Sequence, residues 1–293
     1  MSNETSYAQQ WQRDGAICIP GLLKPESLPK LRQMAEWCLS NWRLCNPETG
    51  EPGDSQGRNI FHINNPIYFE SRPELLRVLL ETVALPQILK LVGEIIEGSP
   101  IFRHTTLFMN PIEKDVDGSW HRDSQFLTQT DEEEKRLIES ARTTLFRSVQ
   151  VQIALVPNDD VEVVPRSHFR WDTEEEYRIR KQNNFQNSQS DAMPGARRVA
   201  LEPGDALFFS SFGLHRGRYH VDKYRRTLML TYGRAEGEPD IPKLEYFTYQ
   251  PWFLEAEYLD GMPAEARSFF ELFIDTHKEA WLKKQVLEAE QTA

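Results

Sequence analysis

The sequence predicts a mainly β fold with helical decoration, in which a double-stranded β-helix (jelly roll) core is flanked by N-terminal and C-terminal helices. After Gly98 the chain becomes a series of short strand-like segments separated by turns, such as Pro203-Gly204-Asp205. Before and after this region, apolar residues recur at helical spacing. Several short strands framed by helices are typical of a double-sheet jelly roll.

One domain is expected over residues 1–293, because the chain contains no internal repeat and no linker-like segment. We place its helical N-terminal part at about 1–98, its jelly-roll core at about 99–235 and a C-terminal helical segment at about 250–293.

Residues 5–45 are predicted to form a helix, a short strand and a second helix. Asp14-Gly15 is a turn signal before the strand-like segment Ala16–Ile19, and Pro20-Gly21 closes that strand. From Pro25 to Trp42 the apolar residues recur at helical spacing.

A polar loop rich in Gly, Asn and Pro then covers Cys45–Asn65, and loops of this length are often functional. In residues 73–97 the apolar side chains recur at helical spacing. Pro86 is expected to divide this segment into two helices, because proline interrupts the helical hydrogen bonds. The strands expected after Gly98 are Pro100–Met109, Val149–Val156, Val161–Val164, Arg197–Leu201, Ala206–Ser210 and Arg225–Gly233. Helical inserts or lids are expected at Asp131–Arg142 and Asp172–Gln182, and the last helix runs from Pro263 to about Glu290.

The bulk composition narrows the classes of protein. A formal net charge of −11 argues against generic nucleic-acid binding, which needs a basic surface. No apolar run approaches the roughly 20 residues of a membrane span, and Met1–Gln12 lacks the features of a signal peptide. Three cysteines without a Cys-x-x-Cys motif fit reduced thiols. We therefore expect a cytoplasmic protein with a small-molecule partner and no nucleic-acid or membrane partner, as a monomer or homodimer.

The most informative motif is Trp120-His121-Arg122-Asp123, followed far downstream by His215. Side chains two apart on an extended segment lie on one side, so His121 and Asp123 can bind one ion together. Two histidines and one carboxylate leave an open face, the arrangement of non-haem Fe(II) oxygenases. Alone, a His-x-Asp pair is more often a loop histidine bonded to a neighbouring carboxylate. The preceding strand, and the turn and strand before His215, favour the metal site.

In this ordered set of motifs the chain resembles the phytanoyl-CoA dioxygenase (PhyH) family of Fe(II)- and 2-oxoglutarate-dependent oxygenases. The resemblance extends roughly from Asp14 to Gly233. It includes His121-Arg122-Asp123, the segment Val163-Val164-Pro165-Arg166-Ser167-His168, the strand Pro203–Phe209 before His215, and the pair Arg225-Arg226. The chain departs from the family pattern in two places. Asn158–Glu162 lacks the glycine that the family usually has before its Pro-Gly-Ser-His turn, and Arg166 stands where that turn tends to have glycine. The resemblance implies metal ligation by His121, Asp123 and His215, with Fe(II), 2-oxoglutarate and dioxygen as cofactor and co-substrates.

Arg226 is the expected partner of the distal carboxylate of 2-oxoglutarate, because arginine can pair bidentately with a carboxylate. On its strand it shares a face with Leu228 and Leu230, and we expect the more apolar face to be the barrel interior. The family's spacing from the distal histidine also selects Arg226. The alternative is an ordinary surface charge. Gln152 is a second candidate for the co-substrate if the polar face of its strand lines the cavity, and otherwise that face meets solvent.

The substrate is expected to enter over the open metal face, between the loop Cys45–Asn65 and the insert at 131–142. Candidate contacts are Arg58, His62, Arg122, Gln125 and Phe126, although each is more often an ordinary loop residue. No pattern names the substrate, since a fold does not fix its chemistry.

The resemblance implies hydroxylation of an unactivated C–H bond of a small metabolite, with release of succinate and CO2. The retained Asp123 favours hydroxylation over halogenation, which needs an additional open position. Desaturation or cyclisation at the same iron site stays open, and so does a non-catalytic jelly roll that binds a metal or ligand. A zinc hydrolase is less favoured, because no histidine pair has His-x-x-x-His spacing.

Overall fold

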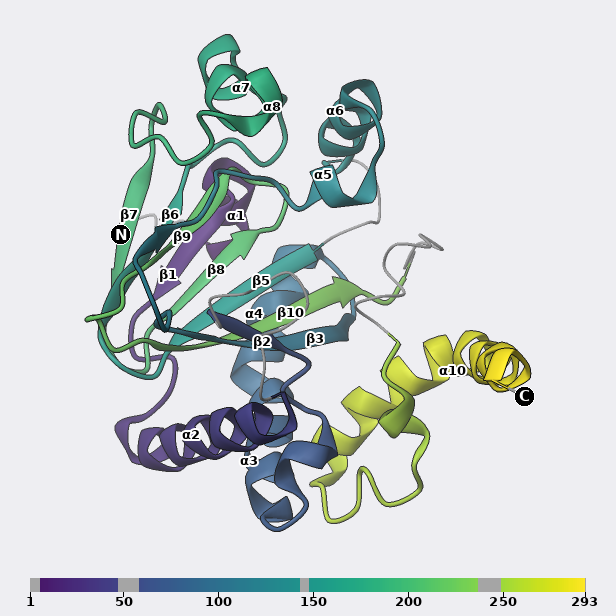
Figure 1. The fold of residues 1–293 in the computed structure, drawn as a ribbon. Coiled ribbons are helices and arrows are strands. Elements are labelled where there is room, and N and C mark those ends of the chain that lie inside the picture. The colour runs from purple at the N-terminus through teal and green to yellow at the C-terminus, as the bar shows by residue number, and fades with distance from the viewer. Residues whose placement is uncertain (1–5, 47–57, 143–147, 237–248, 293) are drawn as a thin grey trace.

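Two antiparallel sheets form the centre of the molecule in the computed structural model, which describes residues 6–46, 58–142, 148–236 and 249–292 (Figure 1). The larger sheet has the strand order β1-β8-β5-β10-β3-β2 and the smaller one β4-β9-β6-β7. Neighbouring strands in both sheets are antiparallel, so the predicted double-sheet jelly roll is confirmed. The strands are β1 (Ala16–Ile19), β2 (Asn59–Phe61), β3 (Pro100–Met109), β4 (Val116–Asp117), β5 (Ser148–Ala154), β6 (Asn158–Val163), β7 (Arg197–Leu201), β8 (Ala206–Ser210), β9 (His215–Tyr219) and β10 (Arg226–Arg234).

The helices gather outside the sheets (Figure 1). In that view α2 and α3 lie below the sheets, whereas α5 to α8 lie above them. The helices are α1 (Tyr7–Asp14), α2 (Leu28–Cys45), α3 (Pro73–Val83), α4 (Pro86–Ile96), α5 (Ser124–Leu127), α6 (Asp131–Ser140), α7 (Glu174–Arg180), α8 (Gln182–Phe185) and α10 (Ala264–Thr292), with short 3-10 turns η1 (Pro25–Ser27), η2 (Pro66–Phe69) and η4 (Pro251–Leu254).

Local sequence signals explain where several helices begin. Ser6, Thr130 and Thr173 each form a capping box before α1, α6 and α7, which satisfies backbone N–H groups at the helix start. Pro73 and Pro86 occupy the first positions of α3 and α4, where the missing N–H group costs nothing. The predicted division at Pro86 is therefore confirmed.

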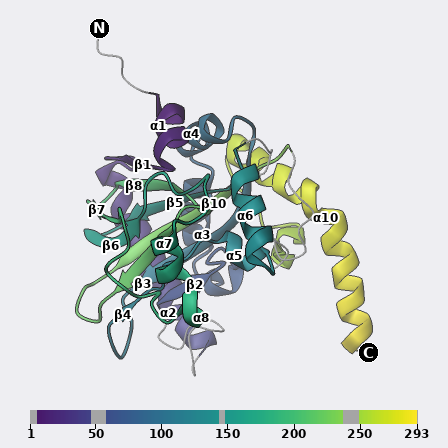
Figure 2. The same ribbon diagram turned by 90° about the horizontal axis from the view of Figure 1, so that it is seen from above.

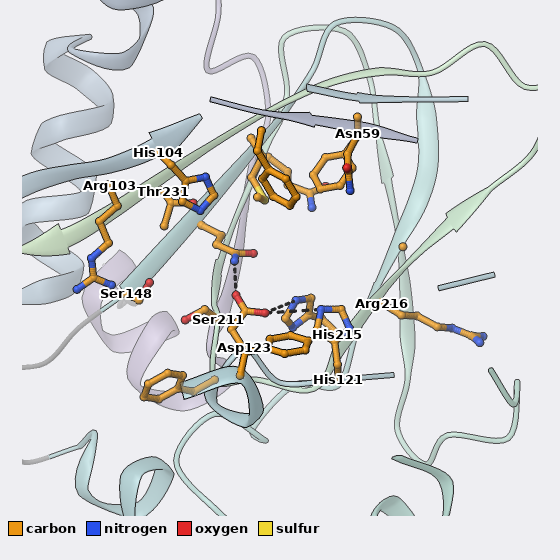
Figure 3. A pocket seen from close by; sticks show the side chains of 18 of the residues that line it. Asn59, Arg103, His104, His121, Asp123, Ser148, Ser211, His215, Arg216 and Thr231 are labelled. Carbon is orange, nitrogen blue, oxygen red and sulfur yellow. Dashed lines mark hydrogen bonds and ion pairs between the residues drawn. The ribbon is translucent and has the colours of Figure 1, made fainter. Parts of the chain in front are cut away.

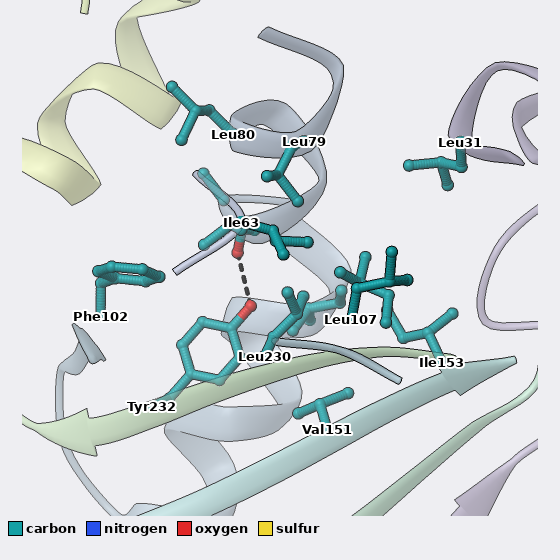
Figure 4. Packing of buried hydrophobic residues seen from close by; sticks show 14 of the residues in the cluster. Leu31, Ile63, Leu79, Leu80, Phe102, Leu107, Val151, Ile153, Leu230 and Tyr232 are labelled. Atoms are coloured by element: carbon teal, nitrogen blue, oxygen red, sulfur yellow. Dashed lines mark hydrogen bonds between the residues drawn. The ribbon is translucent and has the colours of Figure 1, made fainter. Parts of the chain in front are cut away.

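The main hydrophobic core lies between the larger sheet and the helices that cover its outer face. Leu228, Leu230 and Tyr232 project from β10 into this core, where they are fully buried together with Leu79 and Leu80 of α3 (Figure 4). The Tyr232 hydroxyl donates a hydrogen bond to the Val83 carbonyl at 2.7 Å. The apolar face of β10 thus serves helix packing, and its other face is left for the space between the two sheets.

The C-terminal helix α10 completes this core with aromatic side chains. Phe270, Phe273 and Trp281 are buried. The ring centroid of Phe102 in β3 lies 5.6 Å from that of Phe270 and 5.0 Å from that of Phe273. Beyond this contact the helix extends away from the rest of the molecule (Figure 2). The predicted C-terminal helix is confirmed.

Most predicted elements occur within a few residues of their expected bounds, but three strands are missing from the prediction. These are β2, β4 and β9, which are only three, two and five residues long. β2 lies inside the expected loop Cys45–Asn65, of which residues 47–57 are outside the described residues. Within the described part of the chain, no helix combines the length and apolar character that crossing a membrane requires.

Candidate metal centre

His121, Asp123 and His215 come together at one edge of the space between the sheets. One ligand atom from each lies within 4.8 Å of the others. The Nε2 atoms of His121 and His215 are each 3.6 Å from Oδ1 of Asp123, and the two rings have centroids 4.2 Å apart. Figure 3 shows all three side chains converging on one point. The predicted ligand group is therefore assembled.

Backbone pairing brings the two histidines together although they are far apart in sequence. His121 N donates to His215 O at 3.0 Å, and His215 N donates to His121 O at 3.1 Å, which forms an isolated antiparallel bridge. Close to this bridge, Gly118 N donates to Gly217 O at 2.7 Å. A Cβ at position 118 would lie 2.6 Å from Gly217 O, so this approach requires glycine.

The imidazole rings are held so that Nε2 faces the shared point. Nδ1 of His121 lies 2.8 Å from Ser119 O, and Nδ1 of His215 lies 2.9 Å from Gly213 O. A carbonyl can only accept, so Nδ1–H donates in each case and Nε2 keeps its lone pair for a metal. Burial, and then the neighbouring His121 imidazole, hold the pKa of His215 well below its usual value, which keeps this ring neutral.

Asp123 is oriented by Gln150 of β5. Gln150 Nε2 donates to Asp123 Oδ2 at 2.5 Å, which leaves Oδ1 facing the two histidines. Burial raises the pKa of Asp123 to about 6, although His121 and the hydrogen bond from Gln150 oppose that rise. A bound cation favours the ionised carboxylate, so this group fits a metal ligand that needs charge compensation.

A cavity of about 270 Å³ opens in front of these three side chains. Its walls come from both sheets and from α5, and they combine Phe61, Phe126 and Phe212 with polar residues of β3, β5 and β10. Gln152 Oε1 and Thr231 Oγ1 are buried in the walls and have no hydrogen-bond partner among the described residues. Buried polar atoms normally have partners, so these two mark positions where a polar ligand or a water can bind in the cavity. Gln152 thus lies on a cavity-lining strand face.

The expectation that Arg226 faces the barrel interior is wrong. Its guanidinium lies on the helix-covered side of β10, where Nε pairs with Glu36 of α2 at 2.5 Å and Nη1 donates to Asn110 Oδ1 at 3.2 Å. The error has a physical cause. The apolar face of β10 is buried against helices, whereas its polar face lines the cavity.

Arg225 lines the cavity instead. It is 2% exposed and lies between the rings of Phe108 and Tyr219, with its Cζ atom 5.1 and 4.7 Å from their centroids. Its Nε atom is 3.4 Å from Oδ2 of Asp160 and its Nη1 donates to Arg218 O at 3.1 Å. The arginine that lines the cavity is therefore Arg225, which is next to the expected Arg226.

The five expected substrate contacts divide into three groups. Phe126 lines the cavity, with its ring centroid 6.0 Å from that of His121. Arg58 and His62 are not among the residues that line it. The Arg58 guanidinium stacks on Tyr219, and the His62 ring centroid is 6.0 Å from that of His104.

The other two, Arg122 and Gln125, do not line the cavity but belong to a buried charge network. Arg122 is fully buried, and its Nη2 atom lies 2.8 Å from Asp172 Oδ1. Arg180 of α7 binds the other oxygen of Asp172 at 2.6 Å, and it also reaches Glu134 of α6 at 3.0 Å and Gln125 Oε1 at 3.1 Å. This network fastens the His-x-Asp segment to the two helical inserts.

Asp172→Ala is expected to lower the free energy of unfolding by about 3–5 kcal/mol, because it leaves two buried guanidinium groups without their shared carboxylate. Urea denaturation measures the change. Asp159→Ala is the control, since Asp159 forms half-exposed surface pairs with Arg198 and Lys223 that contribute less than about 1 kcal/mol. Equal losses in the two variants would contradict the role assigned to the network.

Several cavity residues were missing from the sequence prediction, including Arg103, His104, Phe108, Ser148, Tyr219 and Thr231. Strand alternation contains a signal for part of this set, because Arg225, Met229 and Thr231 share one face of β10. The register across β3 contains no such signal, since a bulge between Thr231 and Tyr232 brings both Arg103 and His104 to the cavity.

The profile of the family described as phytanoyl-CoA dioxygenase (PhyH) matches residues 11–227, which is most of the chain. The chain belongs to the phytanoyl-CoA dioxygenase family. The PhyH match includes the three grouped side chains and both arginines of the Arg225-Arg226 pair. No match to the chain was found among curated proteins.

Solved structures with the same fold include those of EctD and SnoN. EctD from S. alaskensis with bound Fe has a TM-score of 0.59 and 17% identity, over 87% of this chain and 85% of that one. EctD with 2-oxoglutarate and 5-hydroxyectoine has a TM-score of 0.57 and 18% identity, over 91% and 89%. The epimerase SnoN in complex with Fe3+, alpha ketoglutarate and nogalamycin RO has a TM-score of 0.52 and 16% identity, over 78% and 82%. At these identities the similarity shows the fold that this PhyH member shares with them.

Proposed function

We propose that this protein is an Fe(II)- and 2-oxoglutarate-dependent dioxygenase that hydroxylates an unactivated C–H bond of a small-molecule metabolite and releases succinate and CO2. The observation that supports this most directly is the convergence of two Nε2 atoms and one carboxylate oxygen at the wall of a cavity. Three ligands on one side leave positions for a co-substrate and dioxygen, as in facial-triad Fe(II) enzymes. Membership of the PhyH family agrees with this chemistry.

The donor set fits Fe(II). Two neutral imidazoles and one carboxylate would leave a single positive charge at the metal, which a chelating 2-keto acid can approach. Gln150 fixes the orientation of Asp123, and the Ser119 and Gly213 carbonyls fix the two rings. Such supporting hydrogen bonds hold ligands in place before a metal binds.

The end of the cavity between Gln152 and Arg225 fits 2-oxoglutarate. On β5 and β10, Gln150 pairs with Thr231 and Gln152 pairs with Met229. Gln152 is therefore closer than Gln150 to the end of β10 at which Arg225 lies. We assign the distal carboxylate of 2-oxoglutarate to Arg225, whose planar fork suits a carboxylate. The unpartnered Gln152 Oε1 supports a polar occupant there. This corrects the earlier choice of Arg226 and retains that of Gln152.

In the catalytic cycle, bound Fe(II) and 2-oxoglutarate supply the activation of dioxygen. Asp123, His121 and His215 hold that chemistry at one edge of the cavity. Arg225 orients the co-substrate, while Phe61, Phe126 and Phe212 limit water around the reacting C–H bond. Retention of Asp123 favours hydroxylation over halogenation, since no extra position is open for a halide.

The direct test is anaerobic addition of Fe(II) and 2-oxoglutarate to the purified protein. We expect the visible absorption band of the metal–keto acid chelate, and iron-dependent release of succinate once oxygen is admitted. Absence of the band from folded protein would overturn the proposal, whereas a band without succinate release would indicate a non-catalytic binding protein. Because SnoN, which has the same fold, is described as an epimerase, the organic product must also be identified. A product that gains one oxygen atom supports hydroxylation.

A further inference from the structure

Thr231 of β10 lines the cavity, and its hydroxyl has no hydrogen-bond partner among the described residues. The residue is 4% exposed, so its hydroxyl is shielded from bulk water. Buried hydroxyl groups in proteins are normally hydrogen-bonded. The buried Thr105 of β3 follows this rule, because its hydroxyl donates to Asn64 Oδ1 at 2.8 Å. The unmatched hydroxyl of Thr231 therefore marks a position where an occupant of the cavity can bind.

The strand register places Thr231 in a row with His104 of β3 and Gln150 of β5, each of which pairs directly with it. Side chains that face each other in this way have Cβ atoms about 5 Å apart. All three are buried and line the cavity, and Figure 3 shows Thr231 beside His104. Gln150 also donates to Asp123 Oδ2 at 2.5 Å, so the row reaches the metal ligands. A group bound at Thr231 is therefore held close to the metal centre.

The three side chains of this row are polar and uncharged. Burial, and then His62 and Arg103, lower the pKa of His104 to about 3, so its imidazole is neutral near pH 7. Gln150 uses its amide nitrogen on Asp123, which leaves its amide oxygen as an acceptor, whereas a threonine hydroxyl can both donate and accept. Asp123 is the only carboxylate among the described residues that line the cavity, and it belongs to the metal site. A neutral group that both donates and accepts, such as a hydroxyl, fits this row best.

We propose that Thr231 is a specificity-determining residue whose side chain binds a neutral hydroxyl group of the substrate, a small alcohol with an apolar body. This inference rests on the proposed function, because it places 2-oxoglutarate at the Arg225 end of the cavity. Thr231 follows Arg225 by six residues, or about 20 Å of extended chain, so it is left for the substrate. The apolar body of the alcohol packs against Phe61, Phe126 and Phe212.

The test compares alcohols with hydrocarbons of the same shape in proteins that differ by one hydroxyl. Benzyl alcohol, cyclohexanol and 2-phenylethanol are paired with ethylbenzene, methylcyclohexane and propylbenzene. Affinity is measured on protein loaded with Mn(II) and 2-oxoglutarate, through the paramagnetic relaxation of the ligand protons. For at least one pair, the ratio of alcohol to hydrocarbon affinity is expected to fall about fivefold or more in Thr231→Val, which keeps the shape of the side chain and removes its hydroxyl. Thr231→Ser is expected to keep most of the ratio.

Thr105→Val is the matched control, because it also removes a buried threonine hydroxyl from this sheet. It is expected to keep the affinity ratio but to lower the midpoint of urea denaturation, since Asn64 Oδ1 loses its donor. Thr231→Val is expected to leave that midpoint unchanged or to raise it, because its hydroxyl has no partner to lose among the described residues.

The affinity of each variant for 2-oxoglutarate is measured first by titration of the chelate band. An unchanged ratio in Thr231→Val would overturn the inference and indicate that the hydroxyl binds only water. A large loss of 2-oxoglutarate affinity in Thr231→Val would also overturn it, by assigning the hydroxyl to the co-substrate. Absence of binding by all three alcohols would count against an alcohol substrate. Failure of the wild-type chelate band would instead count against the proposed function.

Discussion

His215→Ala is expected to abolish iron binding and iron-dependent succinate release, whereas His220→Ala is expected to keep both. His215 supplies one of the three grouped ligand atoms, and its ring is held in place by the Gly213 carbonyl. Loss of a supporting residue alone weakens metal binding by about 10- to 100-fold, so loss of a ligand should cost at least as much. His220 lies five residues later and pairs at 3.3 Å with the exposed Asp115.

Iron affinity is measured by anaerobic titration and succinate by chromatography. Asp123→Ala should behave as His215→Ala does, because it removes the oxygen that faces both Nε2 atoms. If His215→Ala bound iron as tightly as His220→Ala, the three grouped side chains would not be the metal site.

The second large effect is expected at the arginine pair. Arg225→Gln should weaken 2-oxoglutarate binding about 100-fold or more, since truncating one partner of a buried charge pair costs about 2–5 kcal/mol. Arg226→Gln should leave that affinity within about threefold of the wild-type value. It should instead lower the free energy of unfolding by about 1–2 kcal/mol, because it breaks the pair with the half-exposed Glu36.

Titration of the chelate band with 2-oxoglutarate separates these outcomes, and urea denaturation measures the two stabilities. The two variants change neighbouring residues to the same side chain, so each serves as the control for the other. A large loss of affinity in Arg226→Gln, with normal affinity in Arg225→Gln, would restore the assignment made from the sequence.

The metal ligands could be predicted from sequence because their local geometry is simple. His121 and Asp123 are two residues apart on an extended segment, and such spacing places both on one side whatever the rest of the fold does. The strand before His215 also has an unambiguous turn and apolar pattern, and the structure confirms it as β8. What the sequence could not show is the backbone bridge that joins His121 to His215, since it depends on pairing between distant segments.

The wrong face for Arg226 has a different origin. Alternation shows that β10 has two faces but not which of them meets the helices. In this protein the more polar face of β10 lines the cavity between the sheets, and the helices bury its apolar face. The position of Arg122 and Gln125 outside the cavity lining was missed for a related reason. Their place in a network with Asp172 and Arg180 depends on the packing of two helical inserts, which no local pattern encodes.

The buried charge network also limits how this protein can be re-engineered. The segment around His121 and Asp123 is short, and its two ligands are separated by one residue. However, the buried guanidinium of Arg122 needs a carboxylate partner, which here is Asp172. Ser124 also donates a hydrogen bond at 2.9 Å to Glu134, which belongs to the insert α6. A graft therefore has to transfer α6 and the Asp172–Arg180 region with the ligands, because the smallest transferable unit is the metal segment together with both inserts.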